Sequence, residues 1–490
     1  MSSTTPTHKT ITPLQDIESE IDDQWGSILN LFDDLRNVIQ PSPDEKLVQT
    51  TTDDDIKKLR ALAAPSSALP LMGVVKEAYK IFDFRMRTNH PMFFGFVPSN
   101  ATSLAWLGDV LVSAFNTHVG GHIAGSGPST VETELIEWLA SRIYFPPSSG
   151  GIFVSGGSVA NLMAIIVASD QILQQTDRSG GVIYISDQAH YSLAKMARIL
   201  GFSEKNVRRI ASDSRFRMQS QDLEHQIKQD RERGLKPFLI IGSYGCTETG
   251  AIDPIKELAD IARGQDMWLH VDGAFGASAT LSYSRPQLAK ELSHAHSVSW
   301  DAHKWLFQTY GCGMLLVHDK AKLASTFRVK SDFIDHSGRV NGNAAEFWDL
   351  GIELTRPSRA MSLWFTLRVL GIERIGKMID IGIDFTETMQ HALEQLSDWE
   401  IVAPATLAIL NFRYNPGNKT NEDLNNINAR ISEALADYND AAIFTVQLRG
   451  KTALRMCCIN TKLVDEDIAN LVTFLNQTVA GLDAHCGTHD

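Results

Sequence analysis

Five short segments of the sequence place reactive side chains directly after runs that predict buried strands. The segments are SGGSVAN, DQAH, CTETG, DGA and DAHK, which begin at Ser155, Asp187, Cys246, Asp272 and Asp301. Ligands collect at the carboxyl ends of parallel strands, because these ends meet at one edge of a sheet. We therefore expect the five segments to converge on one site.

The side chains in these segments supply the parts of one kind of site. Lys304 carries an amine that can form a Schiff base, and Asp272 is a carboxylate that requires a cationic partner when it is buried. His190 offers a flat ring for stacking, and the strand-to-helix turn at Gly157-Ser158 offers free N–H groups to a phosphate. Taken alone, Lys304 could be a surface lysine and Asp272 a helix cap. His190 could be a core histidine, and Gly157-Ser158 an ordinary turn. Together they are the groups that pyridoxal 5′-phosphate requires.

The elements that would position these residues alternate between short β-rich runs and helix-length stretches from about residue 100 to 375. The β-rich runs lie at 151–156, 181–186, 238–245, 268–273, 297–301 and 312–319. This alternation predicts an α/β fold with a mostly parallel sheet and helices on both faces.

The flanking regions have a different character. Residues 1–95 read as a helical segment, with helices expected over 14–40 and from the acidic cluster at 53–55. Strand-like runs at 401–414, 441–450 and 453–460, with helices near 424–439 and 466–481, predict a small α+β domain. The predicted domains are therefore a helical N-terminal segment (1–95), a large cofactor-binding domain (96–375) and a small C-terminal domain (376–490).

The composition argues against several classes of function. The chain has 45 Lys and Arg against 58 Asp and Glu, a formal net charge of −13, so no broad basic field attracts nucleic acid or anionic lipid. The apolar stretch 152–168 is interrupted by Ser, Gly and Asn, so we expect no membrane span. The amino terminus lacks an apolar signal region, and five irregularly spaced cysteines indicate neither a disulfide framework nor a metal site. We expect a soluble, cytoplasmic enzyme for a small molecule.

The sequence resembles the group II pyridoxal-dependent decarboxylases of fold type I, and within them the aromatic L-amino-acid decarboxylases more than the glutamate decarboxylases. The resemblance rests on NHPMFFGFVPS (89–99), SGGSVANLMA (155–164), DQAHYS (187–192), WLHVDGAFGAS (268–278), DAHKWL (301–306) and LTRPSRAMSLWFTLRVLG (354–371). It implies a seven-stranded, mostly parallel central sheet. It also implies an obligate homodimer with its active sites at the subunit interface.

The resemblance implies a role for each matched residue. Lys304 would bond covalently to the cofactor, Asp272 would pair with its pyridinium nitrogen, and His190 would stack over its ring. The other positions would hold the phosphate or line the ring: Gly157, Ser158 and His303 for the phosphate, and Thr247 and Ala274 for the ring.

Other matched positions concern the charge beside the phosphate and the contacts with the substrate. Because an anion repels phosphate, we expect Asp301 to contribute its backbone alone or to point its side chain away. Phe96, Val97 and Pro98 match positions that line the substrate side chain, and His118 falls near a stretch that the partner subunit contributes. Thr355 occupies a position where, in plant relatives, a hydroxyl favours phenols, which indicates tyrosine, dopa or phenylalanine over tryptophan.

One residue departs from the family pattern. The decarboxylases carry a loop tyrosine that protonates the substrate carbon after CO₂ leaves, and counting from Lys304 without gaps places Phe333 at that position. Residues 329–342 contain no tyrosine. The loss of a general acid slows protonation roughly 10²–10⁴-fold, which gives O₂ time to react. Relatives with this replacement release an aldehyde, ammonia and hydrogen peroxide.

Other interpretations stay open at this point. The chain could be an ordinary aromatic L-amino-acid decarboxylase that forms the amine, with His336 or another group donating the proton. It could be an aminotransferase, which the sequence does not distinguish. A catalytically inactive scaffold is disfavoured, because every cofactor residue of the family is present.

Overall fold

The computed structural model describes residues 44–63, 68–97, 100–173, 178–329 and 345–486, together with Leu31 and Leu35. The chain divides into two compact units, Met1–Arg87 and Thr88–Asp490.

The described part of the first unit contains two helices, α3 (Asp53–Leu62) and α4 (Leu71–Asp83). Thr52 caps α3: its hydroxyl oxygen accepts from the Asp55 N–H at 3.2 Å, and the Asp55 carboxylate accepts from the Thr52 N–H at 2.9 Å. This reciprocal capping satisfies two N–H groups that the first turn leaves free. The predicted helix start near Asp53 is confirmed. The helix predicted over 14–40 lies outside the described residues apart from Leu31 and Leu35.

The second unit is built on a seven-stranded sheet. Its strands are β1 (Gly150–Val154), β2 (Gly181–Ser186), β3 (Val207–Ile210), β4 (Lys236–Ser243), β5 (Trp268–Asp272), β6 (Ser297–Asp301) and β7 (Gly313–Val317), in the spatial order β1-β7-β6-β5-β4-β2-β3. Strands β2 to β6 pair in parallel, and β7 runs antiparallel to both β1 and β6. The predicted α/β fold with a mostly parallel sheet is confirmed. The short strand β3 was not predicted, because its sequence VRRI has only two apolar residues.

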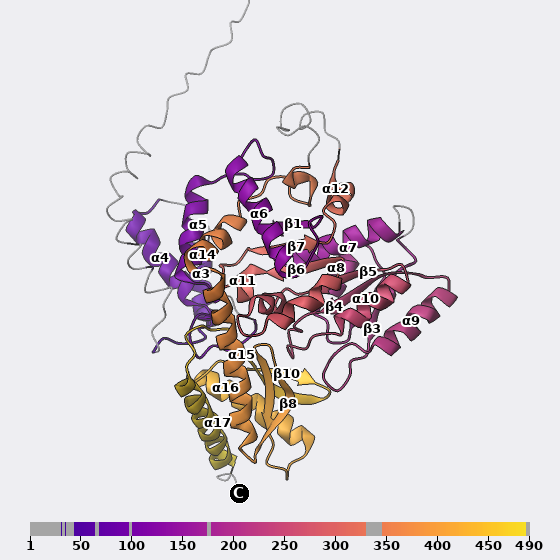
Figure 1. Ribbon diagram of the computed structural model, residues 1–490. Helices are drawn as coiled ribbons and strands as arrows, with labels where there is room; N and C mark the ends of the chain where they lie inside the picture. Colours follow the sequence, from indigo (N-terminus) through magenta and orange to yellow (C-terminus); the bar gives the residue numbers. More distant parts are fainter. Residues whose placement is uncertain are drawn as a thin grey trace, which may run out of the picture. The chain divides into compact units, whose positions relative to one another are not determined.

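Helices cover both faces of this sheet (Figure 1). Alternate residues of a strand point to opposite faces, so Ile183 and Ile185 enter one apolar core while Val182 and Tyr184 enter another. The first core includes residues of α7 (Gly157–Leu173), α8 (Ser192–Ile199) and α12 (Ala321–Phe327). The second includes residues of α6 (Ser126–Arg142), α9 (Ser220–Glu232), α10 (Ile255–Gly264) and α14 (Ala360–Leu370).

The remaining helical segments of this region are short or lie beside α14. They are α5 (Ser103–Phe115), α11 (Ala302–Trp305) and the 3₁₀ helices η1 (Glu204–Asn206), η2 (Gly276–Leu281), η3 (Pro286–His294) and η4 (Phe347–Asp349). Of these, α5 packs against α14.

The C-terminal part contains a four-stranded antiparallel sheet in the order β10-β11-β9-β8. Its strands are β8 (Trp399–Thr406), β9 (Ile409–Tyr414), β10 (Phe444–Leu448) and β11 (Lys451–Cys457), and its helices are α15 (Ile372–Glu394), α16 (Asn421–Asp437) and α17 (Asp465–Cys486). The run 401–414, predicted as one strand, forms parts of two strands, because the chain turns at Leu407 with a φ of 55°. The predicted domain boundary at 375/376 falls within α15. That boundary and the one at 95/96 stay predictions.

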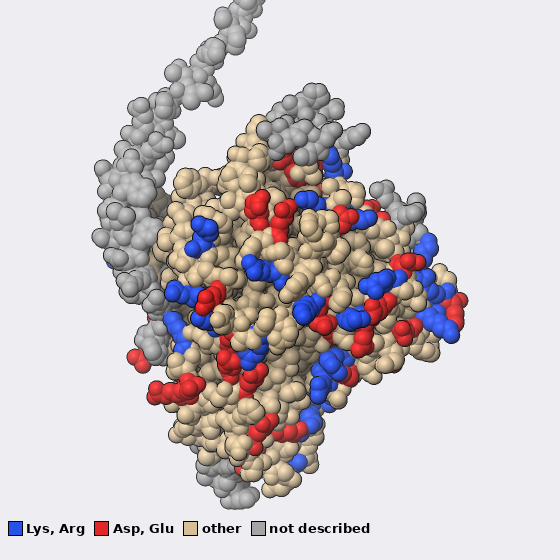
Figure 2. Space-filling model, in the orientation of Figure 1, with Lys and Arg blue, Asp and Glu red and all other residues tan. Residues whose placement is uncertain are grey.

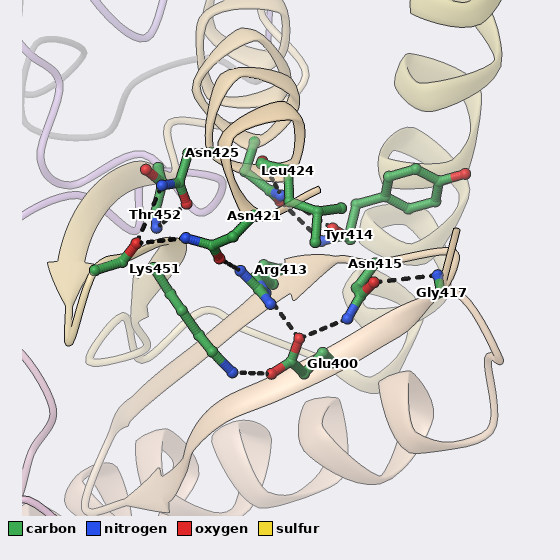
Figure 3. Close-up of polar contacts among 12 residues, drawn as sticks. Glu400, Arg413, Tyr414, Asn415, Gly417, Asn421, Leu424, Asn425, Lys451 and Thr452 are labelled. Atoms are coloured by element: carbon green, nitrogen blue, oxygen red, sulfur yellow. Dashed lines mark hydrogen bonds and ion pairs between the residues drawn. The ribbon is translucent and has the colours of Figure 1, made fainter. Parts of the chain in front are cut away.

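Glu400 on β8 ties three strands of this small sheet together (Figure 3). Its Oε2 accepts from Arg413 Nε at 2.7 Å and from Asn415 Nδ2 at 2.8 Å, and its Oε1 lies 2.5 Å from Lys451 Nζ. Burial opposes the ionisation of Glu400, but the hydrogen bonds from Lys451, Arg413 and Asn415 outweigh it and lower its pKa to about 2. The carboxylate therefore stays charged over the whole physiological pH range.

On the face shown in Figure 2, Lys and Arg side chains are interspersed with Asp and Glu side chains. No helix within the described ranges is both long enough and apolar enough to span a lipid bilayer.

Candidate active site

A pocket of about 380 Å³ lies where the carboxyl ends of the parallel strands meet. Its walls come from the segments that follow β1, β2, β4, β5 and β6. It is lined by all the residues predicted to contact the cofactor: Gly157, Ser158, His190, Thr247, Asp272, Ala274, Asp301, His303 and Lys304. The five segments therefore converge, as their positions after parallel strands predict.

The first turn of α7 forms one side of the pocket. Gly157 begins this helix, and a Cβ atom at this position would lie 2.9 Å from Asp301 Oδ2 and 3.0 Å from the Cβ of Ala274. A residue with a side chain would thus crowd both neighbours. The N-terminus of a helix presents free N–H groups and a partial positive charge, which suits a phosphate.

Lys304 and Asp301 form an ion pair inside the pocket. Lys304 Nζ lies 3.0 Å from Asp301 Oδ2, and His303 Nε2 lies 3.6 Å from the same oxygen. The Asp301 side chain is only 3% exposed, and its Oδ1 is buried without a hydrogen-bond partner. We expected Asp301 to contribute its backbone alone or to point its side chain away, but the structure turns the side chain toward Lys304. The side chain of Lys304 stays 24% exposed, so its amine is accessible from the pocket.

Asp272 is the acceptor at the end of a chain of directed hydrogen bonds. Asn161 Nδ2 donates to Asp272 Oδ2 at 3.0 Å, and Asn161 Oδ1 lies 2.9 Å from His270 Nε2. Because an amide oxygen only accepts, His270 carries its proton on Nε2. Its Nδ1 then accepts from Ser297 Oγ at 2.9 Å, and Ser297 Oγ accepts from Trp268 Nε1 at 2.9 Å. Every donor in this series of hydrogen bonds thus has an acceptor.

Two further contacts and one pKa complete the surroundings of Asp272. Its Oδ1 accepts from the Ala274 N–H and from Ser299 Oγ, both at 3.2 Å. Burial lowers the pKa of His270 to about 4, so its imidazole is neutral at pH 7 and places no positive charge beside the carboxylate. The carboxylate is therefore held by neutral donors on its protein side.

His190 lies in the loop after β2. Its Nδ1 accepts from the Ser192 N–H at 3.3 Å and lies 2.7 Å from Ser192 Oγ, so the ring proton is on Nε2. Burial lowers the pKa of His190, which keeps the ring neutral at pH 7. A neutral, half-buried imidazole at the pocket wall fits the stacking role that the resemblance implies for it.

Four of the residues predicted to contact the substrate, Phe96, Val97, His118 and Thr355, are described by the structure, and none of these four lines this pocket. Phe96 is 57% exposed and adopts a φ of 55°. The segments that carry His118 and Thr355 lie side by side, because His118 Nδ1 accepts at 3.3 Å from the N–H of Arg356, the residue after Thr355. Val97 packs against the main apolar core. Pro98, Phe333 and His336 lie outside the described residues.

Arg455 is a residue near this site that sequence reasoning missed. Its Nε donates to the Thr247 carbonyl at 2.8 Å, and its Nη1 donates to the Phe96 carbonyl at 2.6 Å. It therefore joins the segment that carries Phe96 to the loop that lines the pocket. No local pattern indicates this contact, because Arg455 lies 208 residues after Thr247.

Asn161 and Ser299 were also missed as partners of Asp272. Asn161 belongs to the SGGSVAN segment and lies one helical turn after Gly157, a spacing that places both on one side of a helix. That spacing was a signal for Asn161. Ser299 belongs to the neighbouring strand, opposite Asp272 in the register of β5 and β6, and the strand order supplies the only signal for it.

The fold and the pocket together define a pyridoxal-phosphate-dependent enzyme of the α/β class. The helix N-terminus at Gly157 fits the phosphate, and the accessible amine of Lys304 fits the cofactor carbonyl. Residues 54–415 match the family model described as the pyridoxal-dependent decarboxylase conserved domain. The chain belongs to this family, its cofactor is pyridoxal 5′-phosphate, and it is a carboxy-lyase. The predicted family, cofactor and enzyme class are confirmed.

Known proteins resemble the chain over most of its length. The aromatic-L-amino-acid decarboxylase of Bacillus atrophaeus is 37% identical over 393 residues, which cover 80% of this chain and 82% of that protein. The phenylacetaldehyde synthase of Arabidopsis thaliana is 28% identical over 389 residues, which cover 77% and 79% of the two chains. A crystal structure of Oryza sativa TDC with PLP and tryptamine has a TM-score of 0.87 at 22% identity and covers 96% of this chain and 100% of that one. This last likeness shows the same fold.

Proposed function

We propose that the chain decarboxylates an aromatic L-amino acid and that Phe333 directs the reaction toward an aldehyde product. The observation that carries the decarboxylation is the match of residues 54–415 to the pyridoxal-dependent decarboxylase domain, whose cofactor can be held where Lys304, Asp272 and His190 line one pocket. The relative with 37% identity, which is an aromatic-L-amino-acid decarboxylase, supports an aromatic substrate.

Each of these pocket residues has a different role. When bound, pyridoxal phosphate withdraws electrons from the α-carbon of the amino acid and so stabilises the charge left there as CO₂ departs. Lys304 supplies the amine that holds the cofactor. Asp272 supplies the anion that keeps a ring nitrogen protonated, and its hydrogen bonds from Asn161 and Ser299 hold that carboxylate in one orientation. His190 is neutral and carries its ring proton on Nε2.

The product depends on the group that returns a proton to the substrate carbon. Phe333 has no hydroxyl, so the carbon stays reactive toward O₂ for longer than it does with a tyrosine in place. The balanced reaction consumes one amino acid, one O₂ and one water, and it yields the aldehyde, CO₂, ammonia and hydrogen peroxide. The C–N bond is oxidised by two electrons and breaks, and O₂ accepts these electrons as peroxide. The place of Phe333 in this scheme rests on its sequence distance from Lys304.

A second candidate is an ordinary decarboxylase that releases the amine. The higher identity to the Bacillus atrophaeus decarboxylase than to the Arabidopsis thaliana aldehyde synthase favours it. In this case another acid, such as His336, protonates the substrate carbon. The two candidates share the decarboxylation step and differ only in the final proton transfer.

One experiment distinguishes the two products. Purified wild-type protein, Phe333→Tyr and His336→Ala are each incubated with L-phenylalanine and L-tyrosine, with and without O₂, and amine, aldehyde and peroxide are quantified. We expect wild-type protein to form aldehyde and peroxide in equal amounts, and Phe333→Tyr to return most of the flux to amine, since a placed general acid accelerates protonation roughly 10²–10⁴-fold. Amine without peroxide from the wild-type protein, and its loss in His336→Ala, would establish the second candidate.

We also propose that the chain acts as a homodimer in which His118 and Thr355 contribute to the partner's pocket. Neither residue lines the pocket of its own chain. The segments around them expose large apolar side chains, with Phe115 79%, Leu354 63% and Ile123 60% exposed, and exposed apolar clusters mark interfaces. The molar mass in sedimentation equilibrium tests the dimer, and a monomer at micromolar concentration would contradict it. The cytoplasmic location stays a prediction.

A further inference from the structure

His270 faces two oxygen atoms of one buried residue, Ser297. Both residues are fully buried, and they pair in the register of the parallel strands β5 and β6. His270 Nδ1 lies 2.9 Å from Ser297 Oγ and 3.2 Å from the carbonyl oxygen of the same serine. The two oxygens favour opposite tautomers, because a hydroxyl can donate to an unprotonated Nδ1, whereas a carbonyl can only accept from a protonated one.

The contacts of Ser297 favour the arrangement in which its hydroxyl donates. Trp268 Nε1 donates to Ser297 Oγ at 2.9 Å, so this oxygen already accepts one hydrogen bond. If His270 donated to either oxygen, the hydroxyl hydrogen would lose the acceptor that Nδ1 now provides, and a buried donor without an acceptor costs free energy. Burial lowers the pKa of His270 to about 4, so at pH 7 the ring carries one proton, which the hydroxyl places on Nε2.

The position of this proton sets the orientation of the Asn161 amide. With the proton on Nε2, His270 donates to Asn161 Oδ1 at 2.9 Å, and Asn161 Nδ2 donates to Asp272 Oδ2 at 3.0 Å. With the proton on Nδ1, His270 Nε2 would need a donor, and the amide would turn its Nδ2 toward the ring. Asn161 Oδ1 would then face Asp272 Oδ2. Two acceptor oxygens repel each other unless a proton lies between them, so this arrangement favours a protonated, uncharged Asp272.

The series of hydrogen bonds leads from the interior of the sheet to the cofactor pocket. Asn161 and Asp272 line that pocket, whereas Trp268, His270 and Ser297 do not. The state of the carboxylate at the pocket wall therefore depends on a hydroxyl that touches neither the pocket nor the carboxylate.

We propose that Ser297 is a positioning residue for the cofactor, because its hydroxyl fixes the tautomer of His270. His270 in turn fixes the amide of Asn161, which keeps Asp272 ionised. The inference rests on the proposed pairing of Asp272 with the ring nitrogen of the cofactor. It holds for either product, because both candidate reactions share the decarboxylation step.

A second buried serine provides a matched control. Trp300 Nε1 donates to Ser278 Oγ at 2.9 Å, the same distance as that between Trp268 Nε1 and Ser297 Oγ. Both serines are fully buried, and the two tryptophans belong to different apolar cores. Removing either hydroxyl leaves one indole N–H without this acceptor. Of the two serines, Ser297 is the one that hydrogen-bonds His270.

Ser297→Ala and Ser278→Ala are compared as holoenzymes. Ser297→Ala should lower kcat at least about tenfold and leave KM within about twofold, because the carboxylate acts on the cofactor and not on substrate binding. It should also change the absorbance spectrum of the bound cofactor and raise the dissociation constant of pyridoxal phosphate at least about threefold. Ser278→Ala should leave the spectrum unchanged and these constants within about twofold of wild type. Urea unfolding should show a similar loss of stability in both variants.

The inference is wrong if Ser297→Ala matches Ser278→Ala in kcat and in spectrum. If Ser297→Ala does not fold, Ser297→Cys compared with Ser278→Cys decides in the same way, since a thiol is a weaker donor than a hydroxyl. Asp272→Asn in the same assay separates this failure from that of the proposed function. A wild-type kcat of Asp272→Asn would refute the role of the carboxylate itself, whereas a low kcat beside an unaffected Ser297→Ala would refute the role of Ser297 alone.

Discussion

Asn161 Nδ2 donates a hydrogen bond to Asp272 Oδ2 at 3.0 Å, across 111 residues of sequence. The same amide accepts from His270 through its oxygen at 2.9 Å. Asn161 is 1% exposed, so water cannot replace it without rearrangement of the fold. The orientation of the Asp272 carboxylate therefore depends on a residue of α7 as well as on its own strand.

Replacing Asn161 by Ala should reduce kcat about 10- to 100-fold, which corresponds to the loss of one hydrogen bond to a charged group. The absorbance spectrum of the bound cofactor should also change, because Asp272 then has one neutral donor fewer. Ser169→Ala is the matched control on the same helix, since the Ser169 hydroxyl donates only to the Ile166 carbonyl at 2.9 Å. A kcat of Asn161→Ala within twofold of wild type would show that the amide is not needed.

Lys304→Ala should abolish the yellow colour of the holoenzyme and lower turnover by at least about 10³-fold, because Lys304 is the only lysine among the described residues that line the pocket. Absorbance spectra and CO₂ release check both effects. Lys195→Ala, which removes an exposed lysine of α8, should leave both unchanged. Normal turnover of Lys304→Ala would refute the assignment of the site.

Asp272→Asn should retain part of the cofactor but reduce kcat about a hundredfold or more, since the anionic partner of the ring nitrogen is lost. The substitution also sets an amide N–H₂ among three donors: Asn161 Nδ2, the Ala274 N–H and Ser299 Oγ. The ratio of bound cofactor to protein, measured beside kcat, separates loss of binding from loss of chemistry. Wild-type rates in a variant that binds cofactor normally would assign the carboxylate a purely structural role.

Glu400 should make the stability of the protein depend on acid pH. Its pKa is about 2 in the folded chain, below its ordinary value of 4.5, so its contribution is complete above about pH 4.5 and is lost as the pH falls toward 2. Glu400→Gln should lower the free energy of unfolding by about 1–2 kcal/mol at pH 7, a modest value because the side chain is 27% exposed and solvent screens its ion pairs.

Urea unfolding of Glu400→Gln and wild-type protein at pH 7 and pH 3 measures this effect. The difference between the two proteins should shrink at pH 3, because Glu400 of the unfolded wild-type chain, with its ordinary pKa of 4.5, then binds a proton that the folded chain does not. Glu433→Gln on the exposed side of α16 serves as the control. A difference that stays constant between the two pH values would contradict the low pKa.

The strands and the residues that follow them were largely predictable from the sequence. Lys304, Asp272 and His190 each stand just after an apolar run, and the βα alternation requires such runs to lie parallel, so their ends had to meet. The prediction failed where a strand was short and polar, as at β3, and where a turn at Leu407 interrupts an apolar run.

The sequence by itself therefore determined which cofactor-binding side chains reach the pocket, because a residue's place at a strand end is a local property. Only the tertiary structure decided how these side chains are held. Asn161 meets Asp272, and Arg455 meets the carbonyl groups of Thr247 and Phe96, through contacts that span more than a hundred residues. Such contacts depend on how the layers of the fold pack. The spacing of residues along the sequence does not give the distance between two elements that packing brings together.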